Sequence, residues 1–361
     1  MRVLTLNPGS SSMKVSLVAD GAGVGWAAWD TTDPAAVTQA IRRWSDVDAV
    51  AVRFVHGGSQ KAPARVDDAL LANLERLTSL APNHQPQSLS VTREVRRLLP
   101  DVPVVACFDT AFHARMPEAA ARYPLPRAWT AQNRLRRYGF HGLSCQHALH
   151  RTGELLGRAT EDLQLVCAHV GAGVSVTAIR DGHGVDTSMG FTPLEGAMMA
   201  TRSGSVDPGL LLHVMQTVPM SAAEMADALF HRSGLAGMTG TNGDLRRMLA
   251  AAAHGEPDAE VALDVYRHRL HREIGAAATS LSRLDAVVFT GGVAEYQPGL
   301  ITSVVGGLAV LGLRAGDVPH TDVDRIVTAA DSPVPALIVL PREDLELARG
   351  AEEALARVTV R

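Results

Sequence analysis

The order of apolar and polar positions along the 361-residue chain predicts an alternation of strands and helices. The chain opens with "VLTLN", "KVSLVA" and "VGWAAW", whose alternation and β-branched residues predict three strands separated by polar turns. The same succession of strands and turns returns in "LQLVCAHVGAGVSVTAIRDGHGVDTSMG". The first copy covers residues 3–29 and the second covers residues 163–190. The two copies predict an internally duplicated α/β protein with two similar domains.

Other segments between and after these copies have the spacing of buried strands or amphipathic helices. Further strands are expected at "DAVAVRF", "VPVVACF", "DAVVFT" and "PALIVLP". Helices are expected at residues 34–45, 67–80, 87–99, 207–217, 221–232, 244–254 and 257–283, and in the closing segment "REDLELARGAEEALARV". A chain of this length is usually organised in two domains, and ligands tend to bind where domains meet.

Composition narrows the function classes. A hydrophobic content of 46% and a charged content of 20% are ordinary for a globular protein, and a net charge of −4 gives no sign of nucleic-acid binding. No apolar run approaches the roughly 20 residues of a membrane span, and the N-terminus lacks the apolar core of a secretory signal. Cys107, Cys145 and Cys167 have no metal-type spacing. We therefore expect a cytoplasmic protein that binds neither nucleic acid nor membrane.

The ends of the predicted strands carry residues suited to holding phosphate. Glycines, hydroxyls, histidines, an arginine and an acid occur at residues 7–12, 53–58, 109, 169–173 and 291–292. In α/β sheets such ends line the ligand crevice, and backbone N–H groups, hydroxyls and positive charge all bind phosphate. Two plainer interpretations stay open here. The serines after Asn7 could cap their own hairpin, and the two glycines at 291–292 could form a tight strand-to-helix turn.

Several side chains at these ends, or beside the glycines of "YGFHG" and "TRSGSVDPG", could take part in phosphoryl transfer. Arg53 and Arg202 could clamp a phosphate or a carboxylate with two hydrogen bonds each, although most arginines form surface ion pairs. His141 and His169 could donate to charge that develops on a transferred group, although such histidines are more often core residues. Asp109 could orient a nucleophile or accept backbone hydrogen bonds. The chain has no P-loop, no G-x-G-x-x-G opening a helix and no protein-kinase catalytic loop.

Together these motifs resemble the acetate kinase family, within the superfamily of acetate and sugar kinases, Hsp70-type chaperones and actin. The matching stretches follow the family order from residue 3 to about residue 349: "NPGSSSMK", "RFVHGG", "FDTAFH", "YGFHG", "HVGAG", "TPLEGAMMATRSGSVDPG", "FTGG" and "LPREDLELAR". The resemblance implies two duplicated ribonuclease H-like (actin-like ATPase) domains around a central cleft. The N-terminal domain would comprise residues 1–111 and a returning helix at 345–361, and the nucleotide-binding domain would comprise residues 112–344.

The resemblance also implies an activity and a set of site residues. ATP, with Mg²⁺ or Mn²⁺, would phosphorylate a short-chain carboxylate, acetate by default, to an acyl phosphate by reversible in-line transfer, in a homodimer. The catalytic residues would be Asp109, Arg53, Arg202, His141 and His169. The substrate pocket would be formed by Val55, Asn83, Phe140 and Pro193. ATP or ADP would be bound by Ser10, Ser12, Lys14, Gly171, Gly173, Asp244, Arg246, Gly291 and Gly292, and the metal by Asn7 and Glu343.

Departures from the family pattern leave alternatives open. Asn83 stands where the family has a leucine against the methyl end of the substrate, so propionate, butyrate or a more polar acid are alternatives. Ala172, Ala294 and Tyr296 depart from the pattern around the nucleotide, which leaves a donor other than ATP open. A catalytically weak, nucleotide-binding regulatory relative is the alternative of another class. The other departures are Leu143, Cys145 and Ser205.

Overall fold

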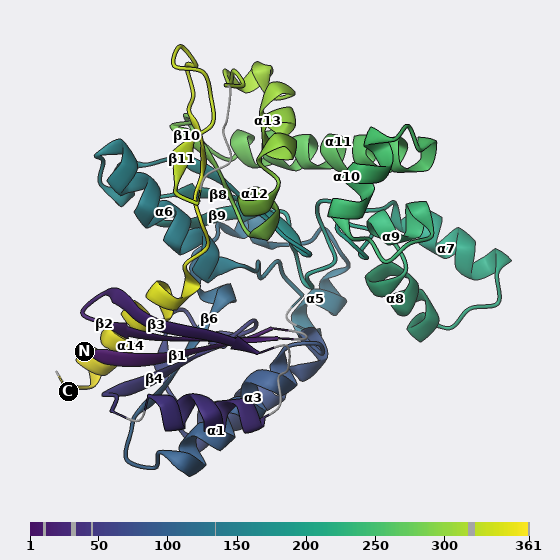
Figure 1. Cartoon of the computed structure of the whole chain (residues 1–361). Coiled ribbons are helices and arrows are strands. Elements are labelled where there is room, and N and C mark those ends of the chain that lie inside the picture. Colours follow the sequence, from purple (N-terminus) through teal and green to yellow (C-terminus); the bar gives the residue numbers. More distant parts are fainter. Residues whose placement is uncertain (10–11, 30–33, 45, 134, 317–321, 360–361) are drawn as a thin grey trace. The chain divides into compact units, whose positions relative to one another are not determined.

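The computed structural model describes residues 1–9, 12–29, 34–44, 46–133, 135–316 and 322–359 (Figure 1). The chain forms two compact units. Unit 1 comprises Met1–Arg115, Tyr138–His147 and Arg342–Arg361, and unit 2 comprises Met116–Arg137 and Ala148–Pro341. Each unit is built around its own six-stranded sheet.

The sheet of unit 1 has the strand order β3-β2-β1-β4-β6-β5. Its strands are β1 (Arg2–Pro8), β2 (Met13–Ala19), β3 (Ala22–Trp29), β4 (Ala49–Phe54), β5 (Ala64–Arg65) and β6 (Val104–Phe108). The first three strands are antiparallel, β1, β4 and β6 run parallel, and β5 pairs antiparallel with β6. Because parallel strands end at the same edge, the residues that follow β1, β4 and β6 are brought close together.

Helices pack on both faces of this sheet, so the central strands β1, β4 and β6 are buried on both sides, whereas the edge strand β3 is largely exposed. Val50 and Val52 of β4 belong to the core that includes Val37 of α1 (Pro34–Arg43) and Leu89 of α3 (Gln85–Leu98). The alternate residues of the same strand belong to a second core with Leu347 of α14 (Glu343–Thr359). Unit 1 also contains α2 (Asp68–Glu75) and the 3₁₀ helices Thr78–Leu80 and Asp109–His113.

The sheet of unit 2 repeats this topology. Its strands are β7 (Leu165–Val170), β8 (Val174–Arg180), β9 (His183–Thr187), β10 (Ala286–Thr290), β11 (Arg325–Ile326) and β12 (Ala336–Ile338). Read as β9-β8-β7-β10-β12-β11, it has the same succession of antiparallel and parallel neighbours as unit 1. The predicted duplication of an α/β unit is confirmed.

The helices of unit 2 are more numerous than those of unit 1. They are α4 (Glu118–Ala121), α5 (Arg127–Asn133), α7 (Pro208–Thr217), α8 (Ala222–His231), α9 (Gly234–Thr239), α10 (Leu245–Ala253), α11 (Pro257–Thr279), α12 (Gly292–Tyr296) and α13 (Pro298–Gly306), with 3₁₀ helices at Thr160–Asp162 and Ala309–Leu311. The helix α6 (Gly142–Leu156) begins in unit 1 and continues into unit 2. Among the described residues, no helix has the length and apolar character to cross a membrane.

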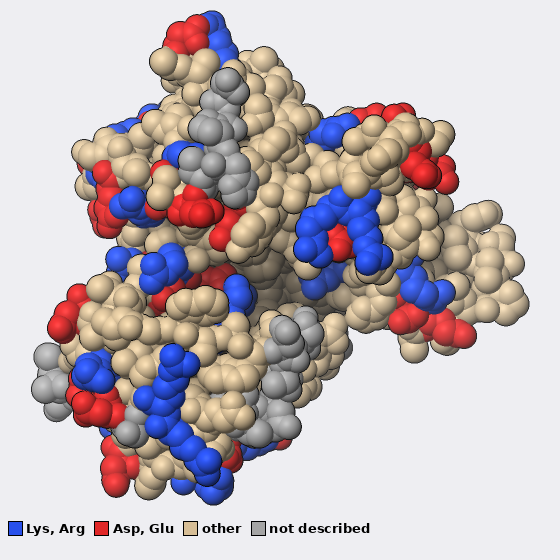
Figure 2. All heavy atoms as spheres, in the orientation of Figure 1, with Lys and Arg blue, Asp and Glu red and all other residues tan. Residues whose placement is uncertain are grey.

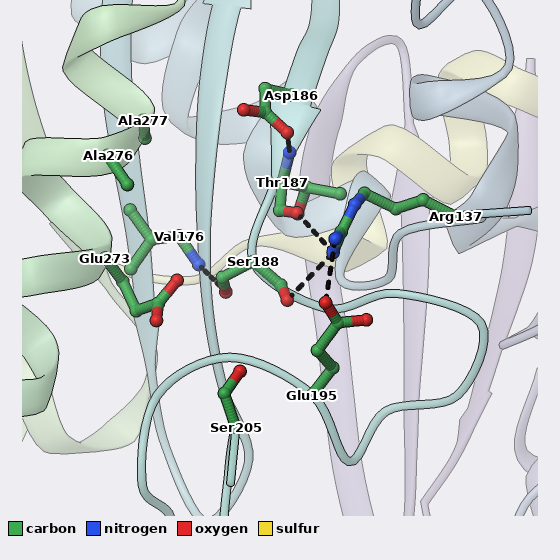
Figure 3. A pocket seen from close by; sticks show the side chains of 10 residues that line it. All are labelled: Arg137, Val176, Asp186, Thr187, Ser188, Glu195, Ser205, Glu273, Ala276 and Ala277. Carbon is green, nitrogen blue, oxygen red and sulfur yellow. Dashed lines mark hydrogen bonds and ion pairs between the residues drawn. The ribbon is translucent and has the colours of Figure 1, made fainter. Parts of the chain in front are cut away.

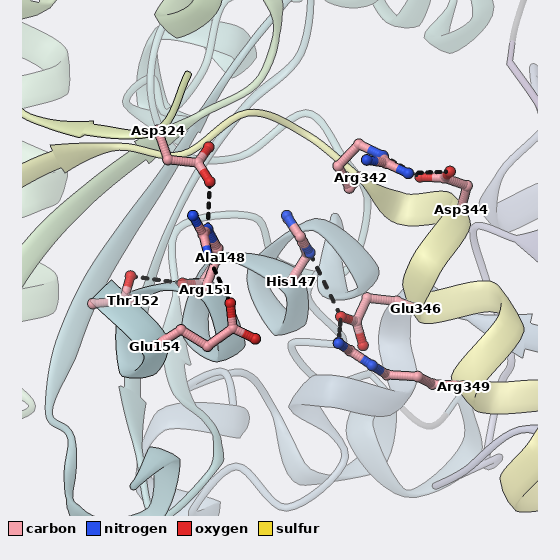
Figure 4. Close-up of polar contacts among 10 residues, drawn as sticks. All are labelled: His147, Ala148, Arg151, Thr152, Glu154, Asp324, Arg342, Asp344, Glu346 and Arg349. Carbon is pink, nitrogen blue, oxygen red and sulfur yellow. Dashed lines mark hydrogen bonds and ion pairs between the residues drawn. The ribbon is translucent and has the colours of Figure 1, made fainter. Parts of the chain in front are cut away.

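The apolar pattern does not predict α6, because its buried face includes polar side chains. The Thr152 hydroxyl donates to the Ala148 carbonyl at 2.6 Å, and Arg151 Nε lies 2.5 Å from Asp324 Oδ2 (Figure 4). In unit 1, the His147 ring lies beside the buried Glu346 carboxylate of α14. Buried polar side chains such as Thr152 and His147 interrupt the apolar stripe from which a helix is recognised in a sequence.

The segment predicted as one helix over 67–80 is α2 followed by a 3₁₀ turn. Asp67 caps the helix by accepting from Leu70 N at 2.7 Å. At the other end the Thr78 hydroxyl donates to the Glu75 carbonyl at 2.7 Å, so a side chain satisfies a carbonyl of the last helical turn. The helix predicted over 257–283 is also shorter than predicted, because α11 ends at Thr279.

Candidate active site

The edge of the unit 1 sheet where β1, β4 and β6 end gathers three of the predicted site residues. Asn7 lies near the end of β1, Arg53 near the end of β4, and Asp109 directly after β6. The register of the parallel pairs, Leu6 with Val52 and Arg53 with Cys107, places these ends side by side. The fold thus converts three distant positions in the sequence into neighbours.

A buried ion pair joins two of these residues. Arg53 Nη2 lies 2.6 Å from Asp109 Oδ2, and Arg53 Nε donates to both carboxylate oxygens at 3.2 and 3.3 Å. The Asp109 side chain is 1% exposed and the Arg53 side chain 13% exposed. Arg53 Nη1 donates to Asn7 Oδ1 at 3.0 Å, and Asn7 Nδ2 donates to Glu343 Oε2 at 2.7 Å. Four predicted site residues therefore form one hydrogen-bonded chain.

The charges of these hydrogen-bonded residues depend on one another. Burial raises the pKa of the Asp109 carboxyl, while Arg53 and the Leu143 backbone N–H oppose that rise. Burial by itself would lower the pKa of Arg53, but the Asp109 and Glu343 carboxylates raise it above its ordinary value. The guanidinium is therefore charged near neutral pH.

The turn that carries His141 packs directly on Asp109. Gly139 and His141 have φ angles of 77° and 55°, in the left-handed region that non-glycine residues rarely adopt. A Cβ on Gly142 would overlap the Asp109 carbonyl oxygen, so only glycine fits there. A His113 ring nitrogen lies 3.1 Å from the Phe140 carbonyl oxygen. Strained backbone held by its surroundings is common where a side chain must be presented in one orientation.

The residues predicted to line the substrate pocket differ in burial. Val55 and Phe140 of unit 1 are buried, and the His56 ring centroid lies 6.0 Å from that of Phe140. Burial lowers the pKa of His56 to about 4, so its ring is neutral near pH 7. Asn83, before α3, is exposed. The fourth residue, Pro193, belongs to unit 2.

In unit 2, two glycine turns lie at the ends of neighbouring parallel strands. His169 of β7 pairs with Thr290 of β10, and the Gly171 N–H donates to the Gly173 carbonyl at 3.0 Å. Gly291 has a φ of 91°, and a Cβ there would lie 2.7 Å from the Val170 carbonyl oxygen. The tight-turn interpretation therefore explains Gly291.

Gly292 differs from its neighbour. Nothing lies within 4 Å of the position that its Cβ would occupy. The side of the turn at Gly292 is therefore open, whereas Gly291 is fixed by the adjacent strand.

Arg202 of unit 2 is surrounded differently from Arg53. Its Nη1 donates to the Pro193 carbonyl at 2.9 Å and lies 3.7 Å from the Met199 sulfur. Burial lowers the pKa of Arg202, and among the described residues no carboxylate forms an ion pair with it. A partly buried guanidinium whose neighbours are neutral can bind an added anion without first displacing a carboxylate.

The remaining predicted residues belong to the nucleotide- and phosphate-binding set. Asp244 caps α10 and pairs with Arg246, with Arg246 Nη2 2.8 Å from Asp244 Oδ2, and this contact lowers the pKa of Asp244 to about 2. Ser12 is partly buried, and its carbonyl accepts from the Gly9 N–H at 2.7 Å. Lys14 is exposed on β2. Ser10 lies outside the described residues.

Comparison with known proteins identifies the family. The sequence profile of the Acetokinase family matches residues 31–349. The chain belongs to this family. It is 43% identical to an acetate kinase of a Synechococcus species over 86% of this chain and 77% of that protein. An acetate kinase of Streptomyces avermitilis is also 43% identical, over 84% of this chain and 76% of the relative.

Solved structures of acetokinase-type enzymes share the fold. The acetate kinase of Porphyromonas gingivalis superposes with a TM-score of 0.87 at 30% identity, covering 98% of this chain and 99% of that one. A propionate kinase of Francisella tularensis superposes with a TM-score of 0.88 at 28% identity, covering 97% and 98%. The predicted fold class, two duplicated actin-like ATPase units, is confirmed, and the protein is a kinase of the acetokinase type.

Three polar residues of unit 2 were not predicted from the sequence. Tyr123, Arg137 and Glu195 form a hydrogen-bonded cluster, and two of them line a cavity of about 160 Å³ with Ser205 and Glu273 (Figure 3). Glu195 lies within the motif "TPLEGAMMATRSGSVDPG" but carries no signal of its own in the sequence. Its partners lie 72 and 58 positions away, so only the fold brings the three together.

The buried ion pair makes unit 1 sensitive to loss of either partner. Arg53→Ala leaves a buried carboxylate unpaired, which is expected to cost about 3–5 kcal/mol of the free energy of unfolding. The matched control is Arg96→Ala, whose partner Asp68 is 92% exposed, with an expected cost of about 0–1 kcal/mol. Denaturant unfolding of the two variants beside the parent measures both values. Equal costs would contradict the importance of the buried pair.

Proposed function

We propose that the protein transfers the γ-phosphoryl group of ATP to the carboxylate of a short-chain acid, acetate by default, and releases an acyl phosphate. Membership of the Acetokinase family and the relatives named acetate kinase support this activity. Within the chain, the observation that carries it is Arg202, a partly buried guanidinium with a carbonyl partner and no carboxylate partner among the described residues. Such a group is suited to an anion that arrives with the substrates.

The reaction is direct and in line. A carboxylate oxygen of the acid attacks the γ-phosphorus, the bond from that phosphorus to the β-bridging oxygen breaks, and ADP leaves with the electron pair. The acid is already ionised near neutral pH, so no general base has to remove a proton. In the reverse reaction, ADP attacks the phosphorus of the acyl phosphate, and the carboxylate leaves with the electron pair. Catalysis therefore comes mainly from positioning and from neutralising charge.

Each candidate catalytic residue has a role in this proposal. Arg53 holds the carboxylate of the acid, and Asp109 orients Arg53 through their two-oxygen contact. Arg202 holds the transferring phosphoryl group. His141 and His169 donate to charge that develops on that group in the transition state. The left-handed backbone of His141 supports such a role because it fixes the direction of the side chain.

The metal in the proposal is Mg²⁺ or Mn²⁺. Mg²⁺ is usually held by one or two carboxylates together with water and substrate phosphates. Asn7 and Glu343, hydrogen-bonded to each other beside Arg53, supply the hard oxygen donors of such a site and would hold the ion. When bound, the ion neutralises charge on the phosphates. No group of three or more His, Cys, Asp or Glu side chains within the described ranges is arranged to hold a metal by itself.

The nucleotide is assigned to the glycine turns and two flanking segments. The open side of Gly292 supports close approach of the nucleotide to the backbone. The phosphates are assigned to Ser10, Ser12, Lys14, Gly171, Gly173 and Gly291, and the nucleoside to Asp244 and Arg246. ATP as co-substrate places the activity in the cytoplasm. A different donor remains a second candidate because Tyr296, at the end of α12, is an exposed aromatic residue 62% accessible to solvent.

Loss of Arg202 is the direct test of the proposed function. Arg202→Ala is expected to lower kcat/KM by roughly 10²–10³, because one donor to the transferring group is lost. Trapping the acyl phosphate with hydroxylamine, from acetate and MgATP, measures the rate as acyl hydroxamate. Arg232→Ala, in the same unit but paired with Asp227 on the surface, is the matched control and should keep full activity. Unchanged activity of Arg202→Ala would exclude this role.

Asn83 tests the identity of the acid. The wild type is assayed with acetate, propionate, butyrate and a hydroxylated short acid at fixed MgATP. Asn83→Leu is expected to raise the kcat/KM of the apolar acids relative to the polar acid by about 10-fold or more, the scale of one apolar group in a pocket. An unchanged ratio would show that Asn83 does not contact the substrate, and a wild type inactive with every acid would favour the regulatory alternative.

We propose that the protein is a homodimer and that α7 contributes to the interface. None of the ten residues of α7 is buried, although Leu210 and Leu212 are large and apolar. Figure 2 shows this helix, at the right edge of the view, without charged side chains. An exposed apolar helix face of this kind is usually covered by a partner, and a second copy of the chain offers the same face.

Leu212→Asp is expected to shift the protein from dimer to monomer, because a carboxylate would be buried without a partner in the interface. Light scattering coupled to size-exclusion chromatography measures the mass. Val310→Asp is the matched control, since Val310 is 92% exposed near the other end of unit 2 in sequence. A wild-type monomer at micromolar concentration, or an unchanged dimer of Leu212→Asp, would contradict the assignment of α7.

A further inference from the structure

The segment that carries Arg202 has no regular structure of its own. Residues 188–205 contain neither a helix nor a strand. Arg202 Nη1 donates to the Pro193 carbonyl at 2.9 Å, so the place of the guanidinium depends on where Pro193 lies. Because no strand or helix fixes Pro193, contacts from outside the segment have to do so.

Glu195, two residues after Pro193, is the main anchor of the segment. Its Oε1 accepts from Arg137 Nη2 at 2.8 Å (Figure 3). Arg137 Nη1 also donates to the Thr187 carbonyl at 3.0 Å and to the Ser188 carbonyl at 3.1 Å. One guanidinium thus ties the start of the segment, after β9, to Glu195, two residues beyond Pro193.

Tyr123 holds the same segment from a second side. Its hydroxyl donates to Glu195 Oε2 and accepts from the Phe191 N–H, the latter at 2.9 Å. The Arg137 guanidinium lies over the Tyr123 ring, 5.4 Å from the centroid. Each carboxylate oxygen of Glu195 therefore accepts a hydrogen bond, and contacts hold the backbone on both sides of Pro193.

The packing around this cluster leaves little room for adjustment. A Cβ on Gly190 would overlap both Glu195 Oε2 and the Tyr123 hydroxyl, so the backbone passes directly against their contact. An antiparallel bridge between Arg122 and Arg136 holds the two segments that carry Tyr123 and Arg137 beside each other. Satisfied polar networks of this type rigidify the structure that they join.

We propose that Tyr123, Arg137 and Glu195 are positioning residues for phosphoryl transfer, which set the Arg202 guanidinium through the Pro193 carbonyl. This inference rests on the proposed function only for the role of Arg202. None of the three touches the reacting atoms in this scheme. Their effect should therefore appear in kcat, through the transition state, and should vanish when Arg202 is absent.

Tyr123→Phe removes only the hydroxyl and is the primary test. It is expected to lower kcat about tenfold, the equivalent of one buried hydrogen bond, with KM for ATP and acid changed less than about twofold. In the Arg202→Ala background the same substitution should change kcat by less than about twofold. Tyr266→Phe is the matched control, because that hydroxyl is buried on α11 without a hydrogen bond among the described residues. Glu195→Gln, which keeps the side-chain shape, provides a second variant and should behave as Tyr123→Phe does.

Crystal structures of the wild type and Tyr123→Phe provide a readout that needs no turnover. The inference expects the contact between Arg202 Nη1 and the Pro193 carbonyl to be displaced in the variant. An unmoved Arg202, or kcat losses that add fully to those of Arg202→Ala, would overturn it. If the wild type forms no acyl phosphate, the proposed function fails, and the crystal comparison alone decides the inference.

Discussion

The ion pair between Arg53 and Asp109 is the contact on which the candidate site of unit 1 depends. Two charges are held together in a nearly solvent-free position at the edge where three parallel strands end. A charge in such a place is tolerated only when it is paired and hydrogen-bonded. The pair in turn fixes Asn7, and through it Glu343, while the turn at Gly142 lies against the Asp109 backbone. The ion pair thus positions the Asn7–Glu343 contact and also the Asp109 backbone against which the turn at Gly142 packs.

Unit 2 supports its arginine by a different arrangement. Arg202 donates to a carbonyl, which keeps its positive charge unneutralised, whereas Arg53 meets a carboxylate. The nearest acidic residue in this sequence segment, Glu195, forms an ion pair with Arg137. Glu195 lies two residues after Pro193, whose carbonyl accepts from Arg202. The segment is therefore held by a strong ionic contact that does not reduce the charge offered to an anion. Functional side chains are commonly held in place by surrounding contacts that do not themselves bind the ligand.

The duplicated fold places different chemistry at equivalent positions. In strand order, β1 corresponds to β7 and β4 corresponds to β10. The end of β1 carries Asn7 and the end of β7 carries His169 with a glycine turn, while β4 ends next to Arg53 and β10 is followed by Gly291. At these two strand ends unit 1 therefore presents an amide and a guanidinium, whereas unit 2 presents glycine backbone beside one histidine. A duplicated sheet provides the same edge twice, and divergence of the residues at that edge assigns the two copies different tasks.

The sequence by itself determined the elements whose signal is local. Alternation and β-branched residues predicted the repeated strands. Residues at strand ends or beside glycine turns, such as Arg53 and Arg202, indicated the candidate chemistry and the family. Tertiary structure alone decided which polar residues meet. The helix α6 buries His147 and Thr152 beside its apolar residues, and Tyr123 and Glu195 become partners across 72 positions. The reason is physical: periodicity records which face of an element is buried, whereas a hydrogen bond between distant side chains exists only once the chain has folded.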